Sequence, residues 1–423
     1  MSTYSDASLI LPIAPTYKAG KIYSLKPTDG SGDFDFTRSG NATRINSEGL
    51  IETVGSNVPR LNYPLIDGVV QNCPSLLLEP ARTNLIQYSE DFSNAYWLKS
   101  TSDSTPVPVV TSNYAISPDG TQNAERVQLT LSTNNEYAVV RRVGINPNAT
   151  VGSTIYQSIY LKATDISQVG KKVDVYIYDQ TNASYRRIFN HVLTNDWERI
   201  ESNNLISFGS TATSVEYVFG KTRYLAAGQD GTSGTITSEA ATDFLVWGAQ
   251  LEAGSFPTSY IKSNSGSATT RSAETCNNAG DANTFNDSEG VLFVEISAFD
   301  DSTKQFSISD GTSANSVKFL YLSGNVFSFQ VRDNFATQCT INKTLTNVNE
   351  TIKAAAKYKQ NDFVLWVNGF KVGQDTIGTV PIGLSELAYD DGGGGSPFYS
   401  STKQIQYFPT ALSDEELALL TSL

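Results

Sequence analysis

Strict alternation between apolar and polar residues is the feature that most constrains the fold of this chain. It is clearest in residues 173–179 (VDVYIYD), where an extended chain has one aliphatic face and one polar, aromatic face. The aliphatic face consists of Val173, Val175 and Ile177, and the opposite face of Asp174, Tyr176 and Tyr178. A repeat of two residues is typical of a β-strand with one buried face. This segment therefore predicts a sheet.

The same pattern recurs along the chain and predicts two β-sandwich domains. Residues 154–163 (TIYQSIYLKA) repeat it in the first half. Further strands are expected at residues 186–192, 215–220, 243–250, 291–297, 305–310, 317–322, 326–331, 353–357 and 404–408. Turn clusters separated by roughly ten to twenty residues suit sandwiches and jelly rolls. We predict an all-β chain with sandwiches over residues 81–262 and 290–423.

Two local motifs refine the second sandwich. Asn368-Gly369 in FVLWVNGFKVG predicts a β-hairpin, because a type I′ turn needs positive φ at both central residues. The sequence from Ser413 to Glu416 is a capping box, in which each end of a first helical turn bonds to the other. Its acidic residues also suit the positive end of the helix dipole. A short helix is therefore expected from about Asp414.

The remaining segments look too poor in core residues to fold alone. Residues 1–80 predict an extended arm, in which Pro12 and Pro15 interrupt an apolar run and remove donors from any strand ladder. Such a segment needs a neighbour to cover it, either its own body or another subunit. Residues 263–289 are rich in Ser, Thr, Asn and Gly and predict a linker.

Charge and cysteine content disfavour several classes of protein. The formal net charge is -13, whereas a polyanion binder needs clustered Lys and Arg, so neither nucleic acid nor an anionic membrane is an expected partner. We find no apolar run long enough for membrane insertion and expect no signal peptide. Cys73, Cys276 and Cys339 lie far apart, which fits neither a disulfide framework nor a zinc site.

Several motifs resemble those of a module found in structural proteins of tailed bacteriophages. They lie in order at residues 34–46 (FDFTRSGNATRIN), 49–63, 75–97 (SLLLEPARTNLIQYSEDFSNAYW), 117–127, 160–163, 195–200 and 247–261 (WGAQLEAGSFPTSYI). The body of that module resembles carbohydrate-binding jelly rolls. Residues 290–423 resemble concanavalin-like, laminin-G-type sandwiches, through the VNG hairpin and the ending FPTALSDEELALL.

The resemblance implies a non-enzymatic virion protein, such as a fibre, spike or capsid decoration. It implies a homotrimer, synthesised in the bacterial cytoplasm and carried on the virion. We expect the arm of residues 1–80 to attach it to other virion proteins. The sandwiches would then bind host-surface glycans or stabilise the particle. The alternative is a virion-associated glycan hydrolase or lyase.

Few residues suggest catalysis. His191 is the only histidine and lies in an expected strand, and no G-x-S-x-G elbow accompanies it. A glycosidase needs two carboxyl groups flanking the scissile bond. Acids close in sequence that offer such pairs are Asp33 with Asp35, Asp300 with Asp301, and Asp390 with Asp391. A chain with 43 acidic residues contains such pairs by chance, so we expect no enzyme activity.

Two sets of residues are candidates for binding. Asp390 and Asp391 precede a glycine run and offer hard oxygen ligands to Ca²⁺, although a glycine run is also a common spacer. No other cofactor is expected. Asp174, Tyr176 and Tyr178 form a polar, aromatic face that suits a sugar. The same face could instead be a cross-strand aromatic ladder or a subunit interface.

Overall fold

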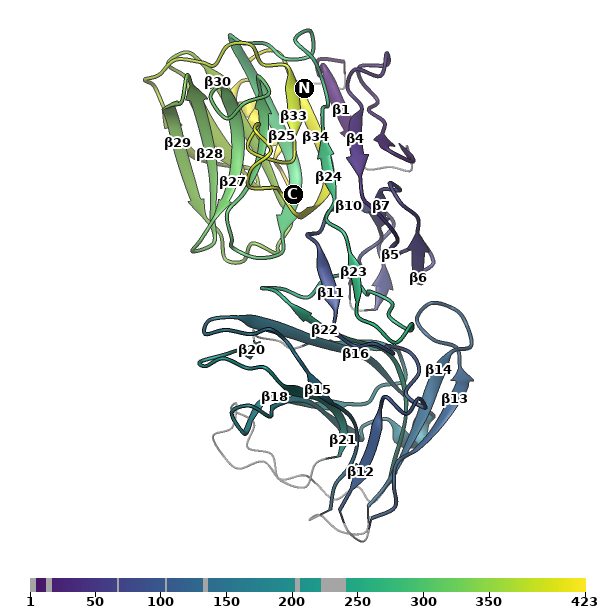
Figure 1. Ribbon diagram of the computed structural model, residues 1–423. Coiled ribbons are helices and arrows are strands. Elements are labelled where there is room, and N and C mark those ends of the chain that lie inside the picture. Colours follow the sequence, from purple (N-terminus) through teal and green to yellow (C-terminus); the bar gives the residue numbers. More distant parts are fainter. Residues whose placement is uncertain are drawn as a thin grey trace. The chain divides into compact units, whose positions relative to one another are not determined.

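The computed structural model describes residues 5–12, 17–66, 68–102, 105–131, 136–201, 206–221 and 241–423, and Pro15 lies outside them. The chain divides into two compact units (Figure 1). Unit 1 consists of Met1–Ala81 with Ser272–Leu423, and unit 2 of Arg82–Arg271. Both are built almost entirely from antiparallel strands, so the predicted all-β class is confirmed.

Unit 2 is a β-sandwich. One sheet, called the tyrosine sheet below, has the order β12 (Leu98–Thr101), β15 (Ala138–Ile145), β21 (Val215–Lys221), β17 (Lys172–Asp179), β18 (Ser184–Val192). The facing sheet has the order β13 (Val109–Ala115), β14 (Ala124–Thr130), β22 (Ala241–Ala253), β16 (Thr154–Ala163), β19 (Glu198–Glu201), and β20 (Ile206–Ser207) also pairs with β16. The remaining elements are the pair β11 (Arg82–Asn84) and β23 (Thr269–Arg271), and the 3₁₀ turn η1 (Ile166–Gln168).

Alternating side chains of both sheets form the core of unit 2. Val175 and Ile177 of β17 and Ile159 of β16 are buried in one cluster, as their spacing predicted. The predicted strand at residues 154–163 is confirmed with the same bounds. The indole of Trp97 contacts the ring of Phe92, with ring centroids 5.1 Å apart, at the centre of this core.

Unit 1 is a second sandwich, and both ends of the chain contribute strands to it. Its long sheet has the order β32 (Phe370–Asp375), β31 (Phe363–Val367), β30 (Ile352–Lys359), β25 (Glu289–Ala298), β34 (Ser400–Phe408), β10 (Ser75–Leu77), β7 (Arg60–Asn62), and β1 (Leu9–Pro12) also pairs with β34. The facing sheet, called the serine sheet below, has the order β29 (Ala336–Thr344), β28 (Val326–Asp333), β27 (Ser316–Leu322), β26 (Lys304–Ser309), β33 (Glu386–Ala388). Smaller sheets are β2 (Tyr17–Lys18), β3 (Lys21–Ile22), β4 (Phe34–Thr37), β24 (Thr275–Asn277); β5 (Ala42–Ile45), β6 (Ile51–Val54); and β8 (Leu65–Ile66), β9 (Val69–Val70).

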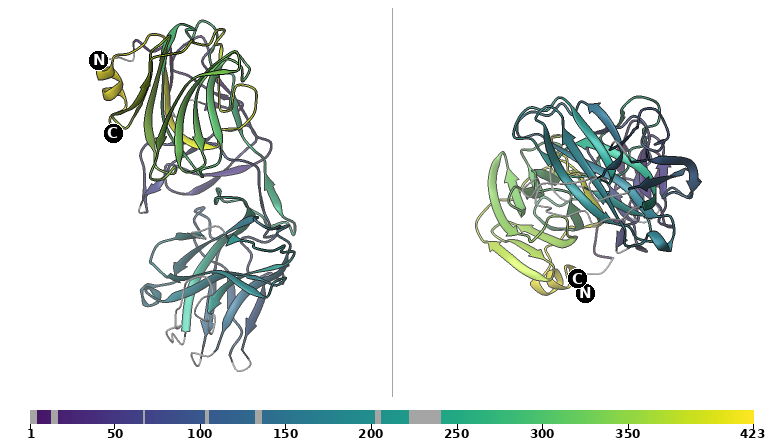
Figure 2. Two further views of the ribbon diagram at one scale, coloured as in Figure 1. Left: turned by 90° about the vertical axis from the view of Figure 1, so that its left-hand side faces the viewer. Right: turned by 90° about the horizontal axis from the view of Figure 1, so that it is seen from below.

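Both local motifs of this sandwich are confirmed. Asn368 and Gly369 have φ of 51° and 81° and join β31 to β32 as a hairpin. Ser413 and Glu416 form the capping box of α1 (Asp414–Leu420). Figure 2 shows α1 against the outer side of the long sheet, where Leu417 packs in a cluster with residues of β25, β30 and β34. Among the described residues, no helix is both long and apolar enough to cross a membrane.

Residues 1–81 are part of the sandwich of unit 1, so of the two neighbours expected to cover the predicted arm, it is its own body that does so. Leu9 and Leu11 of β1 pair with Tyr407 and Ile405 of β34 and are fully buried. Strands β10 and β7 extend the same sheet. The segment lacks a local core, as predicted, but strands almost 400 positions away in sequence supply one.

The predicted linker differs from the structure. Its residues form β23 in unit 2 and β24 in unit 1, and the chain passes between the units at residues 271–272. Cys276 of β24 pairs with Phe36 of β4, and Cys276, Ala279 and Phe285 are buried in the core of unit 1. The sequence does not indicate this burial, because the small Cys and Ala side chains occupy core positions next to the larger rings of residues 1–81.

The buried strand β1 generates a test of this organisation. Leu11→Ala should lower the free energy of unfolding by about 2–5 kcal/mol, because it removes fully buried methyl groups and leaves a cavity. Leu65→Ala, at a leucine with 45% exposure, is the matched control and should have little effect. Denaturant unfolding measures both. Equal effects of the two substitutions would show that residues 1–81 are not part of the folded unit.

Candidate functional site

The predicted aromatic face exists and lies on the outward side of the tyrosine sheet. Tyr176 and Tyr178 point away from the core that Val175 and Ile177 enter. Tyr185 of β18 stands opposite Tyr178, and its ring centroid is 5.0 Å from that of Tyr178 and 5.6 Å from that of Tyr176. Tyr137, which precedes β15, packs against the same cluster. We call Tyr137, Tyr176, Tyr178 and Tyr185 the tyrosine face.

Carboxylates border these rings on the same side of the sheet. Asp174, the third predicted residue, is buried, and its Oδ1 accepts a hydrogen bond of 2.8 Å from Asn190 Nδ2. Glu216 stands opposite Tyr178 and accepts bonds of 2.9 Å from Arg141 Nη1 and from Gln180 Nε2. The structure therefore brings all three predicted residues together.

A glycine keeps part of this face flat. Gly220 of β21 lies between Asp174 of β17 and Val139 of β15 in the strand register. Its φ is +139°, and a Cβ at this position would lie 2.5 Å from the carbonyl oxygen of Ala138. A side chain is therefore excluded from the space between the acid and the neighbouring strand.

The arrangement combines apolar ring surface with donors and acceptors. Such a surface can pack against the C–H face of a sugar ring while its polar groups bond the hydroxyls. Tyr178, Tyr185, Tyr137 and Arg141 are half-buried, so part of each side chain is exposed. Sequence reasoning missed Tyr185 although the turn cluster QTNA at residues 180–183 signals the β17–β18 hairpin. Arg141 and Glu216 come from distant strands and carry no such signal.

The two calcium candidates bind backbone amides. Asp390 is buried, its Oδ1 accepts from the Gly392 N–H at 2.7 Å, and its Oδ2 accepts from Asn277 Nδ2 at 2.9 Å. Asp391 Oδ1 accepts from the amides of Gly393 and Gly395 at 2.9 and 2.8 Å. Amide donors surround these oxygens, and the described residues contain no group of three acidic, histidine or cysteine side chains around a metal position. Calcium binding stays a prediction.

The other paired acids hold local structure. Asp33 Oδ1 accepts from the amide of Ser24 at 2.8 Å, and Asp35 forms a 2.7 Å ion pair with Lys21. Asp300 is paired with Lys304, and Asp301 accepts from the amide of Gly324 at 3.1 Å. Each of these carboxylates thus has a hydrogen-bond or ion-pair partner in the protein. The absence of catalysis remains an expectation.

One acid with a strongly shifted pKa was not predicted. Glu125 of β14 is 3% exposed, and burial, with Asp91 nearby, raises its pKa to about 7. A pKa near neutrality is typical of a catalytic acid. At this exposure, however, the carboxyl cannot meet a substrate in this conformation. In the sequence, Glu125 is marked only by its place in the NAERV motif, and this motif does not indicate that the side chain is buried.

His191 lies beside Val173 in the strand register, with a side chain 12% exposed. Its Nε2 is 3.4 Å from Glu198 Oε2, yet no hydrogen bond satisfies this nitrogen. Burial lowers the histidine pKa to about 4, because the exposed Glu198 carboxylate offsets little of the cost of desolvating a charge. The imidazole is therefore neutral at pH 7.

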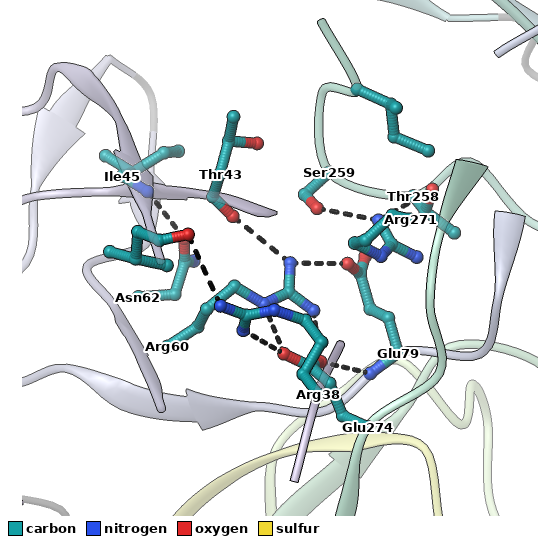
Figure 3. Close-up of polar contacts among 12 residues, drawn as sticks. Arg38, Thr43, Ile45, Arg60, Asn62, Glu79, Thr258, Ser259, Arg271 and Glu274 are labelled. Carbon is teal, nitrogen blue, oxygen red and sulfur yellow. Dashed lines mark hydrogen bonds and ion pairs between the residues drawn. The ribbon is translucent and has the colours of Figure 1, made fainter. Parts of the chain in front are cut away.

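The motifs of the N-terminal segment meet in a buried ion network (Figure 3). Arg60 Nε and Nη2 bind the two oxygens of Glu274, and Arg60 Nη1 donates to Glu79 Oε2 at 2.7 Å. Arg38 Nη1 donates to Glu274 Oε1 at 2.8 Å. The side chains of Arg38, Arg60 and Glu274 have no exposed surface, and that of Glu79 has 4%. Arg38, Arg60 and Glu79, which lie in the motifs, therefore have a structural role together with Glu274.

The network contains two positive and two negative side chains, so its net charge is zero. Burial disfavours the charge of Arg60, but Glu274 and Glu79 outweigh it and hold the arginine pKa above its usual value. Burial lowers the pKa of Arg38, and Glu274 offsets part of that shift. Remaining donors bind carbonyls: Arg60 Nη1 reaches Thr43 at 3.1 Å. Every arginine charge is thus paired and hydrogen-bonded, which a buried ion pair requires.

The WGAQLEAGSFPTSYI motif is equally structural. Trp247 and Tyr260 pack with ring centroids 4.5 Å apart. Glu252 accepts from the amide of Thr258 at 2.9 Å and from its hydroxyl at 2.7 Å. Gln250 Oε1 accepts from the amide of Ile261 at 2.7 Å. The motif therefore closes a turn at the end of β22, inside unit 2.

Comparisons with known proteins leave the family open. No protein-family model matches the chain, and no curated protein matches it. Among solved structures, it is similar to the CBM40 of a Ruminococcus gnavus IT-sialidase bound to α2,3-sialyllactose, with a TM-score of 0.29 and 16% identity over 33% of this chain and 84% of that chain. It is also similar to the enzymatically active domain of tailspike protein 4 of bacteriophage CBA120, with a TM-score of 0.29 and 13% identity over 40% of this chain and 21% of that chain. At these scores the similarities support no argument about function.

The ion network generates a stability prediction. Glu274→Gln should lower the free energy of unfolding by about 3–5 kcal/mol, because it leaves two buried guanidinium groups short of a counter-charge. Lys21→Met is the control, since its ion pair with Asp35 is almost half exposed and should contribute less than about 1 kcal/mol. Denaturant unfolding compares them. A similar loss for both would contradict the central role of the network.

The single histidine generates a pH prediction. Its imidazole NMR signal, which is unique in this chain, should titrate with a midpoint near pH 4. An unfolded chain binds this proton near pH 6.5, so the stability contributed by the neutral form is present above pH 6.5 and is lost as pH falls towards 4. A midpoint at or above 6.5 would mean that Glu198 outweighs burial.

Proposed function

We propose that this protein is a non-enzymatic structural protein of a phage virion that binds host-surface glycans through the tyrosine face. The single observation that carries the glycan part is the grouping of Tyr176, Tyr178 and Tyr185 with Asp174 on one outward sheet face. The ordered series of motifs that resembles phage structural proteins supports the virion part. A homotrimer on the virion would multiply a weak single-site affinity through avidity.

Attachment to other virion proteins is proposed to involve the surface of residues 1–80. Because β1 and β4 are already paired within unit 1, this surface would act as a folded face rather than as a free strand. Particle stabilisation is compatible with the same arrangement. A large buried core in each unit suits a protein that must hold its shape on a particle.

A glycan array with the full chain tests the glycan proposal. Tyr178→Ala and Tyr185→Ala should each weaken binding by about three- to tenfold, because an aromatic contact contributes about 0.5–1.5 kcal/mol. Tyr114→Ala removes a tyrosine that is 45% exposed on β13 and should leave binding unchanged.

Two outcomes would contradict the proposal. Absence of binding even when the chain is multimerised on the array would exclude the glycan role. Equal binding by all three variants would exclude the tyrosine face as its site. Shortening of bound glycans during incubation would favour the alternative, a virion-associated hydrolase or lyase.

A further inference from the structure

A cavity lies between the edge strands of the two large sheets of unit 1. Strand β29 is the edge of the serine sheet (Figure 1), and β32 is the edge of the long sheet. The two edges approach each other at Gly373, where a Cβ would lie 2.9 Å from Cγ2 of Ile341. Beside this contact, residues 342–347 and residues 370–372 line a cavity of about 690 Å³. Pockets that bind small molecules are typically about 300–1,000 Å³.

Uncharged polar side chains line one side of this cavity. Asn342 and Thr344 belong to the end of β29, and Thr346 and Asn347 to the loop that follows it. All four residues are exposed, so a ligand can reach them from solvent. Asparagine and threonine side chains each provide both a donor and an acceptor. This side of the cavity therefore suits a ligand with many hydroxyl or amide groups.

An exposed ring and several aliphatic side chains line the rest of the cavity. Phe370 begins β32 and is 75% exposed. Leu345 and Val372 are half-buried, and Ile352 and Val367 belong to the buried core of unit 1. An accessible phenyl ring can pack against the C–H face of a sugar, and aliphatic side chains can contact a methyl group.

The charged side chains of the lining favour an uncharged ligand. Lys371 is already paired, because its Nζ lies 3.0 Å from Asp414 Oδ2 and donates to Gln374 Oε1 at 2.9 Å. The other two charged side chains of the lining, Lys343 and Glu350, are exposed and opposite in sign. Together they give neither an anion nor a cation a net attraction.

We propose that this cavity binds a short, neutral oligosaccharide that carries acetamido groups. A sugar ring would pack on Phe370, and the acetamido methyl group would contact Leu345 and Val372. Asn342 and Thr344 would form hydrogen bonds with the amide and the hydroxyls of the sugar. The site is in unit 1 and shares no residue with the tyrosine face of unit 2, so it does not rest on glycan binding there.

Calorimetric titration of the full chain with chitotriose, a trimer of N-acetylglucosamine, tests this proposal. Cellotriose is the matched control ligand, because it has the same linkage and ring stereochemistry but hydroxyls in place of the acetamido groups. Chitotriose should bind saturably. Cellotriose should bind at least about tenfold more weakly, since it lacks both the methyl contact and the amide hydrogen bonds.

Three variants locate the binding site. Phe370→Ala should weaken chitotriose binding by about three- to tenfold, because the aromatic contact with the sugar is lost. Asn342→Ala should weaken it by about two- to tenfold through loss of a hydrogen bond. Phe335→Ala is the matched control, since Phe335 is 64% exposed, precedes the other end of β29 and does not line the cavity. All three substitute exposed residues and should leave the denaturation midpoint almost unchanged.

Several results would overturn the proposal. They are absence of chitotriose binding to the unmodified chain, equally tight binding of cellotriose, and equal binding by Phe370→Ala and Phe335→Ala. Tyr178→Ala should bind chitotriose as the unmodified chain does. Loss of binding in Tyr178→Ala, with retention in Phe370→Ala, would assign the sugar to the tyrosine face instead. Failure of the cavity in this titration leaves the glycan-array test of the tyrosine face unaffected, so the two proposals are decided separately.

Discussion

The buried ion network of Arg38, Arg60, Glu79 and Glu274 is the interaction on which unit 1 depends. Arg60 begins β7, Arg38 and Glu79 follow β4 and β10, and Glu274 precedes β24. Their mutual bonds connect the N-terminal segment to the segment that returns from unit 2. Hydrophobic burial alone would allow the short strands of residues 1–81 to pair in several registers. A set of charges that must all be paired in a dry environment excludes most of those alternatives.

Burial and pairing also distinguish the residues of the scaffold from those of the candidate site. Residues in the motifs with the clearest sequence signature, such as Arg60 and Glu252, use their charged groups to bind other parts of the scaffold. The candidate glycan site lies elsewhere, on the outward, aromatic face of the tyrosine sheet. The core on the other side of that sheet positions its side chains.

Local patterns predicted secondary structure well. The alternation in β16 and β17, the Asn368-Gly369 turn and the Ser413 capping box all depend on interactions between residues close in sequence. Placement of Asp174, Tyr176 and Tyr178 on one face followed from the same two-residue repeat. Tyr185 joined them only through the pairing of β17 with β18.

Long-range pairing was not predictable from these patterns. A strand such as β1 shows its apolar face in the sequence but not its partner, and it finds that partner in β34 at the other end of the chain. For this reason the sequence left open which neighbour covers residues 1–81, and it did not indicate that residues 263–289 supply β23 and β24.

The sequence by itself determined the all-β class, most strand positions and the aromatic face, because side-chain alternation is a property of a single extended chain. Only the tertiary structure decided which strands share a sheet, where unit 1 begins and ends, and which charges are buried. Those outcomes depend on contacts between residues hundreds of positions apart. Their energies arise from desolvation and packing, which exist only once the distant strands have met.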